Sequence, residues 1–264
     1  MRIYGDIHGY FKELYASRTI LKSLIIKNLV GRYKYSLLGF SWNFIMPLMM
    51  LFVYYVVFTQ IRSMDIPYFW IFISSALFPF NFLISNFIGG AGCIVNNSGI
   101  VKKMYFPREI IVISQVLSNF VVLLMGYLIV VVAIILSEYN LTWAIVYFPL
   151  LLLLMVIFSI GSALLTSSLT VYVRDVQYFL NSINMIFFFI TPMYFVVDSI
   201  NGLFGAIIWL NPFTYFVESF HQMVYFGEAP SLLLLEICTI ISFLLLFVGV
   251  VVFNKLKSGF AERL

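Results

Sequence analysis

The charged residues of this sequence leave long stretches between them in which every side chain is uncharged. Seven such runs follow Lys34, at residues 35–61, 66–101, 110–137, 139–173, 176–197, 199–217 and 237–254. An ionised side chain costs several kcal/mol at the centre of a bilayer, and a helix needs about 20 apolar residues to cross the hydrocarbon. The runs are therefore candidate membrane spans, and they predict an all-α membrane protein.

The composition supports this class and excludes several others. Apolar residues make up 63% of the chain and charged residues 10%, against roughly 45–50% and about 25% in soluble domains. The 29 Phe, 17 Tyr and 4 Trp are too many to bury in a water-soluble globule of 264 residues. A soluble enzyme and a disordered protein are thereby excluded. So is a disulfide scaffold, because the two cysteines, Cys93 and Cys238, both lie in apolar surroundings.

The positions of Lys and Arg indicate how the runs cross the membrane. Residues unsuited to a full crossing interrupt the run at 199–217, namely Asn201, Gly202, Gly205, Asn211 and Pro212. Lys and Arg concentrate in cytoplasmic loops. With six crossings and a cytoplasmic N-terminus, 14 of the 15 Lys and Arg residues are cytoplasmic, and Arg62 alone is external. We therefore predict six transmembrane helices with both termini in the cytoplasm.

Two segments flank or interrupt these spans. We interpret residues 199–217 as a re-entrant outer segment between spans five and six, broken at Asn211-Pro212, with an apolar loop resting on the headgroups as the alternative. Residues 20–34 are weakly amphipathic and predict an interfacial helix on the inner leaflet, unless they only anchor the topology. The chain is then one domain, 1–264, divided into a cytoplasmic or interfacial N-terminus (1–38), six spans (39–254) and a cytoplasmic tail (255–264).

The usual nucleotide and metal motifs are missing from the sequence. There is no GxxxxGKS or GxxxxGKT loop, and neither HExxH nor CxxC occurs. We therefore expect no cofactor and no catalytic or metal site in this chain. Glu218 and His221 stand three residues apart, so they share a helix face. They are the one visible acid/base pair for a membrane enzyme, with a structural hydrogen bond or a gate contact as the alternative.

Several local motifs occur in a fixed order along the chain. They are the stretch 31–39 with Trp42 and Pro47, the loop 101–109 ending in Phe106-Pro107-Arg108-Glu109, then Arg174-Asp175, the stretch 191–194, Asn211-Pro212 and the tail 253–262. Together they resemble the ABC-2 type polysaccharide export permeases, the membrane subunits of O-antigen, capsule and teichoic acid exporters. The tail and the region around Pro79 look most similar to O-antigen exporters.

This resemblance implies a permease rather than an enzyme. It implies a homodimer that associates with two copies of a separate ATPase, and that ATPase would bind ATP and Mg. The implied cargo is a polysaccharide on polyprenyl diphosphate, moved across the bacterial cytoplasmic (inner) membrane. Membrane lipid is an expected partner and nucleic acid is not. Capsule or teichoic acid export, a membrane enzyme acting on lipid-linked sugars and a scaffold of a glycan-synthesis complex stay as alternatives.

The resemblance and the residue types together suggest roles on the cytoplasmic side. Residues 94–107 are the candidate coupling helix that docks in the ATPase, with contacts from Asn96, Asn97, Lys102, Lys103, Tyr105, Phe106 and Pro107. Asn96, Asn97 and Ser98 offer N-caps for a short helix. The alternative is that the lysines only enforce topology. Arg32, Tyr33 and Lys34 are placed at the cytoplasmic mouth, where they meet either the diphosphate of the cargo or anionic lipid.

Further roles concern the passage itself. Sugar rings pack their C–H faces on aromatic rings. The candidate channel lining is therefore the aromatic set of the first span, Trp42, Phe52, Tyr55 and Phe58, although packing against lipid or other helices would explain each of them equally. The candidate outer gate comprises Trp209, Asn211, Pro212, Glu218 and His221.

Overall fold

The computed structural model describes residues 16–31, 36–61, 66–103, 106–136, 139–197, 200 and 202–264. Every regular element in these ranges is a helix, which confirms the all-α prediction for this part of the chain. The elements are α2 (Arg18–Gly31), η1 (Gly39–Ser41), α3 (Trp42–Tyr55), η2 (Val56–Ile61), α4 (Phe69–Asn96), α5 (Ser98–Lys103), α6 (Glu109–Leu136), η3 (Trp143–Tyr147), α7 (Phe148–Tyr172), α8 (Asp175–Ile190), α9 (Leu203–Leu210), α10 (Pro212–Phe220), η5 (His221–Tyr225), α11 (Leu232–Leu256), η6 (Lys257–Gly259) and α12 (Phe260–Arg263).

Four helical stretches of the described residues are long and apolar enough to cross a membrane. They are Phe69–Asn96, Glu109–Val132, Trp143–Tyr172 and Leu232–Arg263, and they coincide with the second, third, fourth and sixth predicted spans. The first predicted span is the 14-residue α3 followed by the π-helix η2, and the fifth is the 16-residue α8. α8 ends at Ile190 because Thr191 precedes Pro192 and adopts an extended conformation, which a following proline favours.

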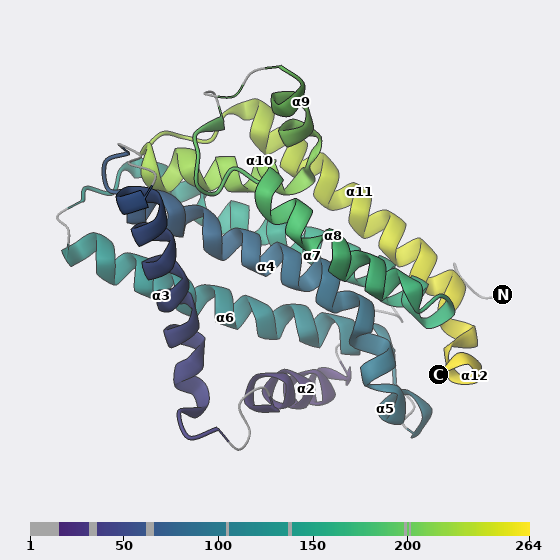
Figure 1. Ribbon diagram of the computed structural model, residues 1–264. Helices are drawn as coiled ribbons and strands as arrows, with labels where there is room; N and C mark the ends of the chain where they lie inside the picture. Colours follow the sequence, from purple (N-terminus) through teal and green to yellow (C-terminus); the bar gives the residue numbers. More distant parts are fainter. Residues whose placement is uncertain are drawn as a thin grey trace.

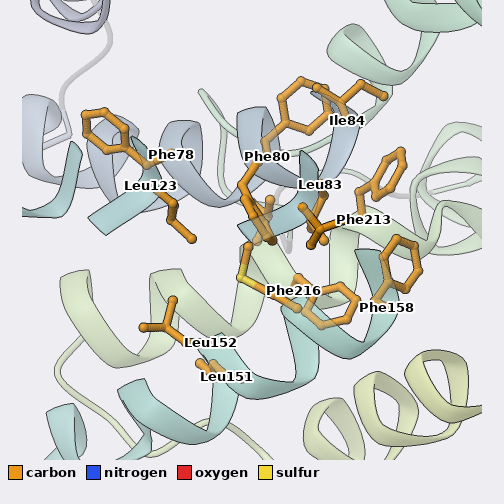
Figure 2. Packing of buried hydrophobic residues seen from close by; sticks show 14 of the residues in the cluster. Phe78, Phe80, Leu83, Ile84, Leu123, Leu151, Leu152, Phe158, Phe213 and Phe216 are labelled. Atoms are coloured by element: carbon orange, nitrogen blue, oxygen red, sulfur yellow. The ribbon is translucent and has the colours of Figure 1, made fainter. Parts of the chain in front are cut away.

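Helix α4 lies in the middle of the bundle and contacts α3, α6, α7, α8 and α10 (Figure 1). An aromatic cluster joins three of these elements (Figure 2). Phe213 of α10 packs edge-to-face on Phe80 of α4 and on Phe158 of α7, with ring centroids 6.1 and 5.9 Å apart. This geometry is favourable for aromatic pairs because the positive ring edge meets the negative face. The cluster fixes α10 inside the bundle.

Helices α7 and α11 cross at very close range. A Cβ added to Gly249 would collide with the backbone carbonyl of Gly161, and one added to Gly161 would collide with the backbone at Leu245 and Leu246. Small residues permit such an approach, which gains van der Waals contact where no hydrophobic effect separates helix from lipid. Ser242 of α11 also donates a hydrogen bond of 3.0 Å to the Leu154 carbonyl of α7. The two helices therefore form a tightly packed pair.

The predicted interfacial segment 20–34 corresponds to α2, whose described part ends at Gly31. The helix packs against α6 (Figure 1). Leu24 is buried in this contact, and the Asn28 amide donates to the Ser114 hydroxyl at 3.4 Å. Ile26 and Val30 remain exposed, so α2 keeps an apolar surface away from the bundle.

Candidate functional site

The predicted coupling segment lies where α4 ends and α6 begins, at one end of the bundle (Figure 1). The backbone carbonyl of Asn97 accepts hydrogen bonds from the amides of Ile100 and Val101, which starts α5. The side chain of Asn97 does not cap α5 as its position suggested. Its amide donates to the Cys93 carbonyl at 2.8 Å, and its oxygen accepts from the Lys27 ammonium at 2.8 Å. Asn97 therefore ties the end of α4 to α2.

The residues of the coupling segment divide into an exposed and an inward-facing set. Asn96, Lys102 and Lys103 are exposed, and the two lysines stand in the last turn of α5. Phe106 is half-buried and packs against the hydrophobic core, and Pro107 is also half-buried. Tyr105 lies outside the described residues. The polar side chains are thus available to a partner, whereas Phe106 holds the loop to the bundle.

The two ends of the coupling loop and the C-terminal tail are joined by a group of contacts that we call the cytoplasmic clasp, formed by Arg108, Glu109, Lys257, Phe260 and Tyr172. The Lys257 ammonium donates to the Glu109 carboxylate at 2.6 Å, and the Arg108 guanidinium donates to the Lys257 carbonyl. Arg108 also lies over the Phe260 ring, 5.8 Å from its centroid, and the Tyr172 hydroxyl donates to the Leu256 carbonyl at 3.0 Å. The Phe-Pro-Arg-Glu loop and the tail are therefore one structural unit.

The predicted channel residues do not converge. Phe52 and Tyr55 are 68% and 41% exposed on α3. Phe58 instead packs within the protein, stacked on Tyr194 with centroids 5.0 Å apart. The Trp42 indole donates to the Ser36 hydroxyl at 2.9 Å and lines a cleft of about 250 Å³ between α3, α4 and α6. The predicted mouth residues Arg32, Tyr33 and Lys34 lie outside the described residues.

Sequence reasoning missed the polar residues of this cleft. Asn81, Ser85 and Asn119 line it together with Trp42. The Asn119 amide also donates to the Asn86 carbonyl oxygen at 2.7 Å, a buried hydrogen bond between α6 and α4. Amide side chains within otherwise apolar spans were the available signal, because such groups must find partners across helices.

The predicted break at Asn211-Pro212 is the tight turn between α9 and α10. The Asn211 carbonyl oxygen of the side chain accepts from the Phe213 amide at 3.0 Å and so caps α10, and Pro212 occupies the first helical turn. The Asn211 side-chain NH2 donates to the Thr191 hydroxyl at 2.8 Å. Both side chains are buried, so the turn is fastened to the end of α8.

Glu218 and His221 are neighbours, as their spacing predicts. His221 Nδ1 lies 3.6 Å from Glu218 Oε2, and Nε2 lies 3.2 Å from the Phe72 carbonyl. A carbonyl only accepts, so Nε2 carries the hydrogen. The imidazole stacks on the Phe72 ring at 4.0 Å and is 1% exposed. His221 therefore joins η5 to α4 and does not reach a cavity surface.

A second cavity of about 360 Å³ opens between α9, α10 and α11. Trp209 and Glu218, two of the predicted gate residues, line it, and the sequence gave no indication of their neighbours Tyr215, Gln222 and Ser231. The Trp209 and Tyr215 rings lie 5.3 Å apart, and the Tyr215 hydroxyl donates to the Trp209 carbonyl at 2.7 Å. Polar and aromatic groups thus converge on one side of α10.

Two tyrosines close the same end of the molecule. The Tyr139 hydroxyl donates to the Tyr225 carbonyl, and the Tyr225 hydroxyl donates to the Pro67 carbonyl at 2.8 Å. Burial raises the pKa of Tyr139 above its ordinary value, and Tyr68 raises it further. Burial likewise raises the pKa of Tyr225, with a smaller effect from Tyr139. Both phenols therefore remain donors at neutral pH.

Comparison with known proteins places these features in a wider set. A family model described as ABC-2 type transporter matches residues 19–225, from α2 to η5. Two Klebsiella pneumoniae proteins, each named O-antigen export system permease protein RfbA, are 32% and 30% identical over 247 and 242 residues, which cover 90% of this chain and 92% of each relative. A Myxococcus xanthus protein of the same name is 27% identical over 256 residues, 96% of this chain and 98% of that protein.

Proposed function

Because the chain belongs to the ABC-2 type transporter family, we propose that it is the permease subunit of an ATP-driven exporter of O-antigen. The cargo is a polysaccharide linked to polyprenyl diphosphate, which crosses the bacterial cytoplasmic membrane. The observation that carries this proposal is the similarity to proteins named O-antigen export permeases over nine-tenths of the chain or more. The same names favour O-antigen over capsule or teichoic acid as cargo.

We propose that the single domain 1–264 crosses the membrane six times, through α3 with η2, α4, α6, α7, α8 and α11. Both termini are then cytoplasmic, and α5 and the cytoplasmic clasp face the cytoplasm. The shorter α3–η2 and α8 complete the crossing through their adjoining segments.

The α9–α10 pair is, in this topology, a re-entrant segment. Phe213 at the start of α10 contacts Phe80 and Phe87, which are 11 and 18 residues beyond the first residue of α4. At a rise of 1.5 Å per residue these positions lie about 16 and 27 Å along α4. The hydrocarbon core is about 30 Å thick. This depth supports re-entry and an outer-gate role for Asn211 and Pro212.

We propose that two permease subunits enclose the passage and that each binds one ATPase subunit, which holds ATP and Mg. Helix α5 is the docking element, because Lys102 and Lys103 are exposed there beside the direct junctions with α4 and α6. The exposed Phe52 and Tyr55 face the passage, while Arg32, Tyr33 and Lys34 receive the diphosphate at its cytoplasmic mouth. Trp42 lies above this mouth, in the cleft with Asn81 and Asn119.

The enzyme alternative is disfavoured by the geometry of its acid/base pair. A general acid or base must approach the proton that it transfers within hydrogen-bond reach. His221 is 1% exposed and is committed to the Phe72 carbonyl and ring. We therefore propose that the chain has a transport role and that ATP hydrolysis resides in the partner.

The testing experiment is co-purification of the tagged chain with its ATPase, followed by export of lipid-linked polysaccharide in proteoliposomes. Lys102→Glu/Lys103→Glu reverses the charge of α5, and we expect it to abolish the complex and export. Lys22→Glu, an exposed lysine on α2, is the matched control and should retain both. A complex that survives the α5 reversal would refute the docking role. A wild-type chain that recruits no ATPase and moves no glycan would refute the exporter function.

A further inference from the structure

The cavity between α10 and α11 has the size and lining of a small-ligand site. Its volume of about 360 Å³ falls within the range of roughly 300–1,000 Å³ that is typical of ligand pockets. Trp209 and Tyr215 contribute two neighbouring aromatic rings, and apolar residues of α11 contribute much of the opposite side. Aromatic rings of this kind pack against the C–H faces of other ring systems.

A carboxylate supplies hydrogen-bond acceptors to this cavity. Glu218 lines the cavity and is 7% exposed. Its contact with His221 is 3.6 Å long, which exceeds the length of a hydrogen bond. A carboxylate has about four lone-pair sites. Glu218 therefore retains the capacity to accept hydrogen bonds from a ligand.

The opposite capacity comes from Gln222 and Ser231. Gln222 Oε1 accepts from the Ser231 backbone amide at 2.8 Å, and because an N–H only donates, the assignment of oxygen and nitrogen in this side chain is fixed. The NH2 group of Gln222 is thus left to donate. The Ser231 hydroxyl oxygen accepts from the Leu234 amide at 3.4 Å, so its hydrogen also remains available. The cavity presents acceptors and donors together.

This combination distinguishes between ligand chemistries. An ammonium group only donates and would leave the Gln222 amide unmatched, whereas a phosphate only accepts and would be repelled by Glu218. A hydroxyl both donates and accepts, and a sugar ring adds apolar C–H faces for Trp209 and Tyr215. We propose that the cavity binds one pyranose unit of the exported glycan, an assignment that rests on the proposed export function. Bound there, the sugar contacts α10 on the outer side of the gate.

The test uses the permease–ATPase complex in nanodiscs and isothermal titration with one- and two-repeat oligosaccharides, released by mild acid from the surface polysaccharide of the producing cells. We expect saturable binding to the wild type. Glu218→Gln removes the charged acceptor and Gln222→Glu removes the donors, each with little change of shape. Each is expected to weaken binding about tenfold or more, as the loss of a hydrogen bond to a charged group would. Glu236→Gln, an exposed glutamate of α11 outside the cavity lining, should bind as the wild type does.

The remaining outcomes separate this inference from the export function. Displacement by 2-aminoethyl phosphate without saturable oligosaccharide binding would identify a lipid-headgroup site and overturn the inference. Equal weakening by Glu236→Gln would also overturn it, because the effect would then come from general charge. Export in proteoliposomes is measured in parallel. Export by a wild-type complex that binds no oligosaccharide refutes only the sugar site, whereas oligosaccharide binding without any ATP-driven export supports the site and refutes the exporter function.

Discussion

Replacing Lys257 by Met is expected to destabilise the protein more than neutralising its partner Glu109. The ammonium and carboxylate are 2.6 Å apart, but the Glu109 side chain is 6% exposed and that of Lys257 is 34% exposed. Removal of Lys257 therefore leaves a buried carboxylate, whereas Glu109→Gln leaves an ammonium that water can still solvate. Within the described residues, the second carboxylate oxygen of Glu109 has no hydrogen-bond partner to offset the loss.

The magnitudes follow from this asymmetry. Breaking a fully buried pair costs roughly 3–5 kcal/mol, and exposed pairs contribute about 0–1 kcal/mol. Because Lys257 is one-third exposed and Arg108 stands next to Glu109, we expect about 3 kcal/mol for Lys257→Met and about 1 kcal/mol for Glu109→Gln. The double variant has no buried charge left unpaired. It should therefore be more stable than Lys257→Met alone.

The assay is the free energy of unfolding in detergent micelles, measured by SDS titration with circular dichroism, for the four members of this double-mutant cycle. Lys255→Met is the control, because Lys255 is exposed on the preceding turn of α11. If Lys257→Met and the double variant are equally stable, the carboxylate of Glu109 is solvated and the reasoning from burial is wrong.

Three further results are expected. Gly249→Ala should lower the free energy of unfolding by about 2 kcal/mol or more, because its Cβ collides with backbone across the α7–α11 crossing, while Gly99→Ala, with no atom within 4 Å, should be tolerated in the same SDS titration. Asn211→Ala should cost about 1 kcal/mol through the lost N-cap of α10, and an unchanged unfolding midpoint would contradict that role. Burial raises the pKa of Tyr139 above 10.0, so the folded state holds this proton more tightly, and its contribution to stability is present below about pH 10 and lost as the pH rises through the folded pKa. Thermal unfolding measured against pH should show this decline, and Tyr139→Phe should reduce it.

The long helices of this fold were predictable because charge is expensive in a bilayer. Uncharged runs located α4, α6, α7 and α11 to within a few residues. The same criterion is insensitive to backbone geometry. It therefore extended the fifth span past Ile190, where the Thr191-Pro192 pair ends α8, although the proline itself was a readable signal.

The candidate site was less predictable because its contacts join distant residues. The spacing of Glu218 and His221 implied their proximity, since positions three apart share a helix face. Nothing local pairs Glu109 with Lys257, which stand 148 positions apart, and charge placement alone explains both as topology signals. Gln222 and Ser231 likewise resemble ordinary residues of an outer loop until the fold brings them beside Trp209.

The contacts around α5 also have a mechanical consequence. Asn97, just before α5, is fastened to Lys27 near the start of the chain, and Glu109, just after it, is fastened to Lys257 near the end. A force applied to this short helix is therefore resisted at three points, and a displacement strains the N-terminal helix and the C-terminal tail together. Fluorescent labels on α2 and α12 would then change their separation whenever α5 moves, so the two ends of the polypeptide serve as a strain gauge for its cytoplasmic face.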